Sequence, residues 1–287
     1  MPVVGRVSQV WRYPVKSMAG EQLQRSMVQT RGLAGDRGWA LRDEHVGEIR
    51  GAKKLYDLLR CAARYLEEPA GDSIPAAEIT FPDGARLRCD DPAAAASLSA
   101  LLRRPVTVWP RQPASDRDFY RRAKPDTDDF MSEVRAMFGR TEGEPIPDLL
   151  QFPQELLQFT SPLGTYFDAF PLHLLTTASL AAMREHNPGG DFDARRFRPN
   201  LLIETVSDCC GLVEFDWCGR VLRIGSAGIA IALPAVRCVM PTLAQVDLPK
   251  DPSVLRTVVR HAGQNLGVYA TVEAPGTVAL GDVVELE

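Results

Sequence analysis

Short stretches in which apolar and polar residues alternate recur along the chain, and a period of two is typical of β-strands. The first covers residues 3–13, where Val, Trp and Tyr alternate with polar residues until Pro14 ends the stretch. The chain has 22 glycines and 22 prolines, which separate these stretches as turns would. Further strands are expected at residues 23–28, 39–42, 62–66, 78–81, 86–89, 106–109, 171–175, 213–215, 220–224, 227–233, 267–272 and 276–286.

Only a few helices are expected, from capping residues at their ends or from apolar residues at a period near 3.6. They cover residues 92–102, 128–138, 176–187 and 253–262. The second of them places Phe130, Val134, Met137 and Phe138 on one apolar face. Many short strands and few helices predict a mainly β protein with some helices (α+β), built around a barrel-like core.

Residues 113–160 differ in composition from the rest of the chain, because polar residues and prolines dominate them. We interpret this segment as a connection between domains that is placed to act as a lid over a site. The chain of 287 residues is long enough for two domains with hydrophobic cores. The prediction is therefore an N-terminal β-barrel-like domain over residues 1–112, the connecting or lid region over 113–160, and a second β-barrel domain over 161–287.

Charge and cysteine usage exclude several functional classes. The formal net charge is -4 and the sequence pI is about 5.7, so no basic excess points to a nucleic-acid partner. No stretch approaches the roughly 20 apolar residues that cross a bilayer, and the first residues lack the pattern of a secretory signal. The six cysteines form no C-x-x-C pair and show no zinc spacing. We expect reduced thiols in a cytoplasmic protein with no membrane partner.

One cysteine lies in a setting that suits chemistry. Cys238 follows Arg237 and lies between Pro234 and Pro241, directly after an apolar, strand-like stretch. A thiol beside a cation at the end of a strand suits a nucleophile or a metal ligand. The other interpretation is a small buried side chain that only packs, as most free cysteines do.

Several groups that bind anions occur at the ends of predicted elements. Each has an ordinary alternative: a solvated loop lysine, a surface Asp–Arg pair, or a helix N-cap. Taken together they repeat one theme, since ammonium, guanidinium, hydroxyl and amide groups all donate hydrogen bonds to phosphate. The candidates are Lys16, Ser17, Arg37, Thr176, Ser179, Arg198 and Asn200. This set with one soft sulfur ligand suits a phosphate-bearing cofactor whose metal accepts a protein thiolate.

Five ordered motifs resemble those of a known family. Tyr13-Pro14-Val15-Lys16-Ser17 followed by Gly35-Asp36-Arg37 resembles the signature of the β-barrel domain that precedes MOSC domains. The MOSC domain itself is named after the C-terminal part of molybdenum cofactor sulfurase. The motifs that resemble it are Phe197-Arg198-Pro199-Asn200, Arg237-Cys238, and Pro275-Gly276-Thr277-Val278 with Gly281-Asp282. Among functional relatives, the chain is similar to the mitochondrial amidoxime-reducing components and their bacterial counterparts.

The resemblance implies a molybdenum cofactor, molybdopterin with Mo, and assigns roles to the candidates. Cys238 would be the molybdenum ligand and the catalytic residue. The pterin or its phosphate would be contacted by Lys16, Ser17, Arg37, Thr176, Ser179, Arg198, Asn200 and Arg237. Relatives of this kind reduce N-hydroxylated compounds, such as amidoximes, hydroxylamines and N-hydroxylated bases, to the N–H product and water. The protein would orient cofactor and substrate while the metal carries the redox chemistry.

Two departures from the relatives shape the expected partners. The chain has no four-cysteine cluster like that of a ferredoxin domain, so we expect a separate electron-donor protein beside the small N-oxygenated substrate. The pyridoxal-phosphate domain of the sulfurase has no counterpart here, which disfavours sulfurase activity. The alternative function is a non-catalytic protein that carries molybdenum cofactor, or sulfur as a persulfide on Cys238.

Overall fold

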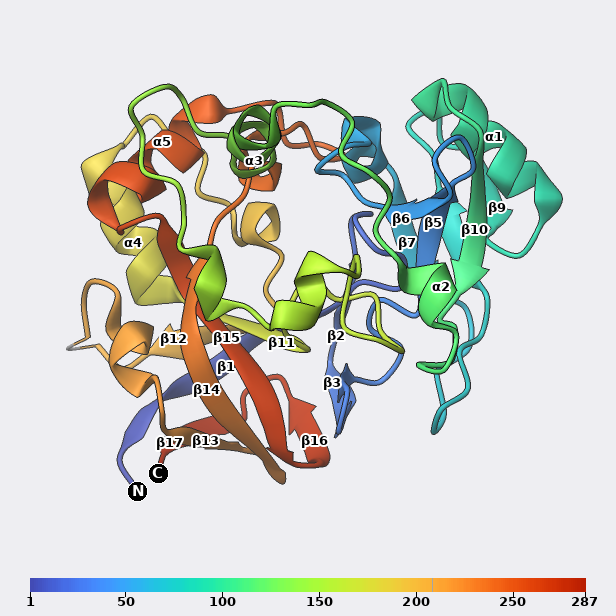
Figure 1. Cartoon of the computed structure of the whole chain (residues 1–287). Coiled ribbons are helices and arrows are strands. Elements are labelled where there is room, and N and C mark those ends of the chain that lie inside the picture. Colours follow the sequence, from blue (N-terminus) through green and yellow to red (C-terminus); the bar gives the residue numbers. More distant parts are fainter. Residues whose placement is uncertain (208) are drawn as a thin grey trace.

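A closed β-barrel forms one end of the molecule (Figure 1). In this computed structural model, which describes residues 1–207 and 209–287, seven strands of the described chain pair in the order β12-β11-β15-β14-β13-β17-β1, and β1 pairs back onto β12. β2 (Glu21–Leu23) extends the sheet beside β1. The barrel strands are β1 (Val3–Arg12), β11 (Leu172–Thr176), β12 (Leu201–Thr205), β13 (Val221–Ile224), β14 (Ala227–Val236), β15 (Asn265–Ala274) and β17 (Val283–Leu286).

An irregularity in β1 lets residues from both sides of it face the barrel core. Val7 and Val10 are three positions apart, yet both are buried there with Ile203 of β12 and Val284 of β17, because the pairing of β1 with β12 shifts between Val7 and Gln9. β11 and β12 are parallel, and the chain crosses between them through helix α4 (Thr177–His186). The barrel therefore joins the first strand of the chain to strands from its last third.

Three small sheets lie outside the barrel, in the orders β10-β5-β6, β7-β8-β9 and β16-β3-β4, and the last takes one strand from the C-terminal end. The first two pack around a second core, whereas Val28, Leu33 and Val278 of the third belong to the barrel core. Met240 and Leu243 from the C-terminal half insert into the second core, so the two parts share side-chain packing. The strands are β3 (Arg25–Gln29), β4 (Gly32–Leu33), β5 (Trp39–Asp43), β6 (Glu48–Arg50), β7 (Ala62–Tyr65), β8 (Ala77–Thr80), β9 (Arg86–Arg88), β10 (Val106–Pro110) and β16 (Gly276–Ala279).

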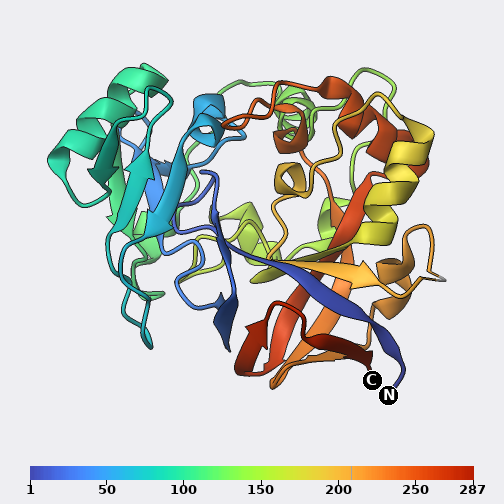
Figure 2. The same cartoon turned by 180° about the vertical axis from the view of Figure 1, so that it is seen from behind.

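Helices cover the outside of both parts (Figure 2). α4 and α5 (Pro252–His261) pack together beside the barrel, and α1 (Pro92–Leu102) covers β10. Among the described residues, no helix is long and apolar enough to span a membrane. Short 3-10 helices complete the described elements: η1 (Tyr56–Arg60), η2 (Leu149–Gln151), η3 (Gln154–Leu157), η4 (Ala194–Phe197), η5 (Val213–Trp217) and η6 (Met240–Thr242).

The connecting region crosses the face that Figure 1 shows and carries α2 (Arg117–Tyr120) and α3 (Phe130–Phe138). It packs on the loop that follows β14: the Val239 N–H donates to the Met137 carbonyl at 3.1 Å. At the other end of α3, Asp126 pairs with Arg50 and Lys54 of the N-terminal part. The segment is thus tied to both parts of the molecule, while its function as a lid stays a prediction.

We expect the Asp126 ion pairs to stabilise the protein at neutral pH. The hydrogen bond from Arg50, with help from Lys54, lowers the pKa of Asp126 to about 2. A depressed carboxyl pKa contributes stability above pH 4, and this contribution is lost as the pH falls from about 4 to 2. After allowance for the partial exposure of the pair, Asp126→Asn should cost about 1 kcal/mol at pH 7.

Urea unfolding of Asp126→Asn at pH 7 and near pH 2 measures this effect, with Asp128→Asn as the matched control. The difference in free energy of unfolding between Asp126→Asn and wild type should vanish near pH 2, and Asp128→Asn should not differ from wild type at either pH. A difference for Asp126→Asn that is equal at both pH values would contradict the pairing.

The structure confirms the predicted mainly β, α+β fold class, and two local predictions were wrong. The expected strand at residues 213–215 is part of the 3-10 helix η5, because its middle residue, Glu214, is drawn inside by two hydroxyl groups. Phe130, expected on the apolar face of its helix, is 58% exposed, while Val134 and Phe138 are buried as predicted.

Candidate functional site

The turn that ends β1 presents Lys16 and Ser17 to the interior. The Lys16 N–H donates to the Trp39 carbonyl at 2.8 Å, which fixes the turn against the start of β5. Ser17 has a φ of 68°, and the close approach of Gly51 keeps it in place: a Cβ at Gly51 would lie 2.5 Å from Ser17 Oγ. Both residues are buried, yet the Ser17 hydroxyl has no hydrogen-bond partner within the described ranges.

Asp36 is a buried hub that joins the turns of both parts. Its Oδ1 accepts from the Tyr13 N–H at 2.8 Å, and its Oδ2 accepts from Asn200 Nδ2 at 2.9 Å and from Arg37. Asn200 in turn accepts the His173 N–H at 3.1 Å. With its amide committed to these contacts, Asn200 holds the framework of the site together.

Two arginines stack on one aromatic ring. The guanidinium carbons of Arg37 and Arg198 lie 4.7 and 4.1 Å from the centroid of the Tyr13 ring. Both backbones are left-handed, with φ of 47° and 56°, and this conformation turns the side chains inward. Burial lowers the pKa of Arg198 to about 10, and Arg37 adds to this effect, so Arg198 is still a cation at neutral pH.

The residue before the candidate cysteine is also an inward arginine. Arg237 donates to the Phe197 carbonyl at 2.7 Å and contacts His173 Nε2 at 3.3 Å. Its Nε is buried without a described partner. Burial, together with the nearby Arg237 charge, holds the pKa of His173 well below its usual value, so this imidazole is neutral.

Cys238 lies half-buried between the core of the N-terminal part and the small apolar cluster of the connecting region. It is within electrostatic range of Lys53, Arg140 and Tyr269. Arg140 donates to the carbonyl of the preceding Arg237 at 3.0 Å. The connecting region therefore forms one wall beside the thiol.

Sequence reasoning missed one ion triplet of the site. Asp168 accepts from Lys16 Nζ at 2.6 Å through Oδ1 and pairs with Lys53 Nζ at 2.8 Å through Oδ2. Partial desolvation opposes ionisation of Asp168, whose side chain is 46% exposed, but the two ammonium groups outweigh it and hold its pKa well below the usual range. Lys53 lies beside Lys54 in a turn that begins at Gly51, and this pattern could have identified it from the sequence. No pattern in the neighbouring sequence marks Asp168 as a site residue.

The hydroxyl groups of Thr176 and Ser179 bind a buried carboxylate, that of Glu214. Ser179 donates to both Glu214 oxygens at 2.6 and 2.7 Å, and Thr176 donates to Glu214 at 2.7 Å while it caps α4. All three side chains are fully buried. The structure thus brings together Lys16, Ser17, Arg37, Arg198, Asn200, Arg237 and Cys238, whereas the contacts of Thr176 and Ser179 are with Glu214. Their predicted contact with a pterin stays a prediction.

Loss of a hydroxyl from this buried carboxylate should weaken the fold. Ser179→Ala removes a donor from Glu214, whose pKa is already raised by burial, and we expect it to lower the free energy of unfolding by about 2 kcal/mol. Chemical denaturation at pH 7 measures the change, with Ser132→Ala on the exposed side of α3 as control. Equal stability of the two variants would show that Ser179 has no such role.

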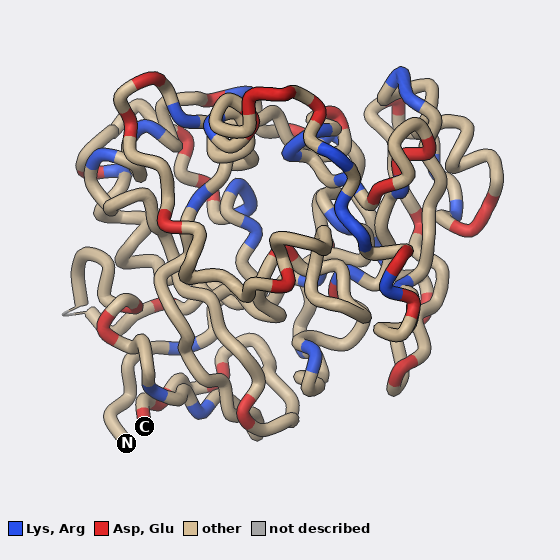
Figure 3. The backbone as a smooth tube through the Cα atoms, in the orientation of Figure 1, with Lys and Arg blue, Asp and Glu red and all other residues tan. Residues whose placement is uncertain are grey.

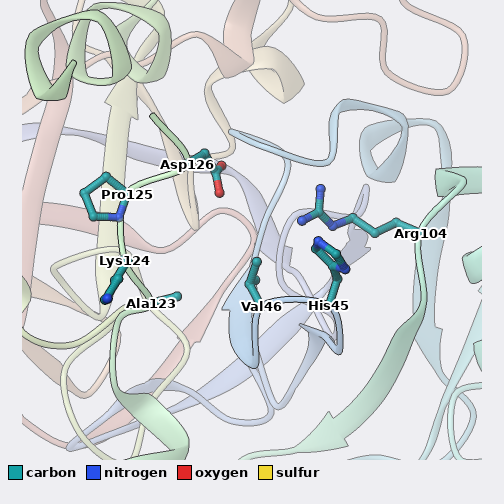
Figure 4. Close-up of a pocket in the computed structure, with 7 residues that line it drawn as sticks. All are labelled: His45, Val46, Arg104, Ala123, Lys124, Pro125 and Asp126. Atoms are coloured by element: carbon teal, nitrogen blue, oxygen red, sulfur yellow. The ribbon is translucent and has the colours of Figure 1, made fainter. Parts of the chain in front are cut away.

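Two cavities lie around these elements. A cavity of about 160 Å³ is lined by Tyr13 and Arg198 together with Trp11 and Gln245. A wider hollow of about 690 Å³ lies between the N-terminal sheet and the connecting region and contains no residue of the candidate site (Figure 4). Its Asp126 and Arg104 are engaged in ion pairs with other residues, and of the candidate residues Arg198 alone lines the smaller cavity.

The site is strongly cationic in an acidic protein. Figure 3 shows lysine and arginine positions gathered around the middle of the molecule, where the two parts meet. We call five of them the basic cluster: Lys16, Lys53, Arg37, Arg198 and Arg237. Two carboxylates, those of Asp36 and Asp168, balance this cluster in part. The described residues contain no group of three or more His, Cys, Asp or Glu side chains that could hold a metal ion.

Two solved structures illustrate the likeness to known folds, and both are distant in sequence. The YUAD protein from Bacillus subtilis is 11% identical, with 99% of this chain and 95% of that chain covered and a TM-score of 0.46. YiiM from Geobacillus stearothermophilus is 20% identical, with 41% and 54% covered and a TM-score of 0.33. No curated protein matches the chain. At these TM-scores the likenesses carry no argument about function.

Family models match both parts of the chain. The MOSC N-terminal beta barrel domain matches residues 4–104, and the MOSC domain matches residues 164–285. MOSC domains in general are associated with molybdenum cofactor binding, in sulfurase-like or oxidoreductase roles. The chain therefore belongs to the MOSC-domain family, with a MOSC N-terminal beta barrel domain followed by a MOSC domain.

Proposed function

We propose that this protein is a molybdenum-cofactor-binding oxidoreductase that reduces N-hydroxylated substrates to their N–H products. The observation that carries the proposal is the junction of the basic cluster, in which Lys16, Arg198 and Arg237 are buried, with a half-buried thiol, Cys238, at the meeting point of the two MOSC-family parts. Every group except Lys53 was expected from its own motif, and the fold brings the motifs from different ends of the chain together.

The donor set fits an anionic cofactor. A guanidinium has five N–H donors, and within the described residues Arg198 uses one, to the Met18 carbonyl at 2.6 Å. The buried Nε of Arg237 and the Ser17 hydroxyl have no partner there either. Buried donors without acceptors cost free energy, and phosphate oxygens are the acceptors that guanidinium groups pair with best.

Each residue then has a defined task. Lys16, Ser17, Arg37, Arg198 and Arg237 would hold the pterin phosphate, and the Cys238 sulfur would ligate the metal. When bound, the molybdenum cofactor would supply the two-electron chemistry. Asn200 and Asp36 would hold these groups in position through their hydrogen bonds. The apolar cluster of Val134, Phe138 and Val236 would limit the access of water to the thiol.

Turnover of a model substrate tests the proposal. The reaction consumes two electrons and two protons per amidoxime and yields one amidine and one water. Protein made in a cofactor-competent host should convert benzamidoxime to benzamidine with reduced methyl viologen as donor, followed by chromatography. Bound cofactor without turnover of benzamidoxime or hydroxylaminopurine would instead indicate a carrier protein.

A further inference from the structure

We propose that Lys53 is a further binding residue of the site, which donates to an oxyanion group of the ligand on the Cys238 side of the basic cluster. This inference rests on the proposed function for the identity of the natural ligand. It concerns a residue that none of the family motifs quoted above contains.

The first observation is how the fold delivers Lys53. The Gly51–Leu55 turn is closed by hydrogen bonds from the Lys54 and Leu55 N–H groups to the Gly51 carbonyl, both at 3.0 Å. Gly51 lies directly against Ser17, where a Cβ would come within 2.5 Å of the hydroxyl oxygen. The turn that carries Lys53 is therefore packed on the turn that carries Lys16 and Ser17.

The second observation is the donor count of the two lysines. Lys16 Nζ donates two of its three possible hydrogen bonds, to the Tyr166 carbonyl at 2.7 Å and to Asp168 at 2.6 Å. Lys53 Nζ has one contact in the described chain, with the other oxygen of Asp168 at 2.8 Å. Two donors of Lys53 thus stay available, and its side chain is 26% exposed, so a ligand can reach it.

The third observation is which charged and polar groups surround each lysine. Asp168 separates the two ammonium groups, so they act on opposite sides of one carboxylate. Lys53 is the one whose charge interacts with Cys238 and Tyr269, whereas Lys16 interacts with Arg37. Lys16 therefore lies on the side of the basic cluster that contains Arg37, and Lys53 lies on the side that contains Cys238.

The neighbouring lysine provides a matched control. Lys54 has the same side-chain exposure of 26% but turns to the connecting region, where it pairs with Asp126 and Glu133. Lys53→Met and Lys54→Met remove the same charge from adjacent positions. Circular dichroism and the thermal midpoint of each variant establish that it folds, and Lys53→Arg keeps the charge.

The experiment has two readouts. The first is molybdenum and pterin content per folded protein made in a cofactor-competent host. The second is binding of inorganic phosphate and of molybdate to cofactor-free protein, by calorimetry at constant ionic strength. Loss of a charge-assisted hydrogen bond should weaken oxyanion binding roughly tenfold in Lys53→Met, while Lys54→Met stays within about twofold of wild type.

The two oxyanions separate the sources of the ligand chemistry. A larger loss for molybdate than for phosphate places Lys53 at the metal end, and equal losses place it at a phosphate; either supports the proposal. The proposal is overturned if Lys53→Met matches wild type in cofactor content and oxyanion affinity. It is also overturned if Lys54→Met loses as much of either as Lys53→Met does. If wild type binds oxyanions through Lys53 but never contains molybdenum or pterin, the proposed function fails and this inference stands.

Discussion

Cys238→Ser should abolish molybdenum-dependent turnover. Substitutions of residues that merely support a metal ligand typically cost 10- to 100-fold, so loss of the ligand itself should lower kcat/KM by more than about 100-fold. A serine keeps the volume of the side chain and its half-buried place between two apolar clusters, so the fold should persist. The measurement is benzamidoxime reduction with reduced methyl viologen, alongside molybdenum content.

Cys218→Ser is the matched control for this prediction. Cys218 is also half-buried and unpaired, but it lies at the end of η5 beside Glu214 and Asp216, away from the basic cluster. This variant should retain molybdenum and turnover. A Cys238→Ser protein that keeps full activity would show that the thiol is a packing residue, the ordinary interpretation of a lone cysteine.

Asp36→Ala should be the most destabilising substitution in the site. It removes the acceptor of the Tyr13 N–H, the Asn200 amide and the Arg37 guanidinium at once, and leaves a cation in the interior without its partner. Breaking a buried ion pair in this way costs about 3–5 kcal/mol. The free energy of unfolding from urea denaturation measures the loss.

Asp36→Ala should also lower the molybdenum and pterin content of the protein. The reason is that Asp36 sets the position of Arg37 and of the Tyr13 ring on which two arginines stack. Asp57→Ala is the control, since Asp57 forms an exposed pair with Arg60 that should contribute less than about 1 kcal/mol. Similar stability of both variants would mean that Asp36 does not organise the site.

The sequence anticipated those features whose causes are local. The alternation in residues 3–13 and the following Pro14 predict β1 and its end, and helix 92–102 coincides with α1. Lys16, Arg37 and Arg198 could be proposed as neighbours because each belongs to a short motif of the family. The fold class followed from the same patterns and is confirmed.

Features that depend on distant contacts could not be read in this way. Asp168 meets Lys16 across 152 residues of chain, and no local pattern marks it. Glu214 looks like the polar middle of a strand between Val213 and Phe215, yet two hydroxyls from another element draw it inside. The same contacts turn Thr176 and Ser179, expected at a phosphate, toward a buried carboxylate.

The most direct test of the account is the metal and pterin content of the wild-type protein. Made in a cofactor-competent host and purified without added anions, the protein should contain close to one molybdenum and one pterin per chain, by elemental analysis and by fluorescence of the oxidised pterin. A folded protein that contains neither, while a known molybdenum enzyme from the same host is loaded, would contradict the central claim.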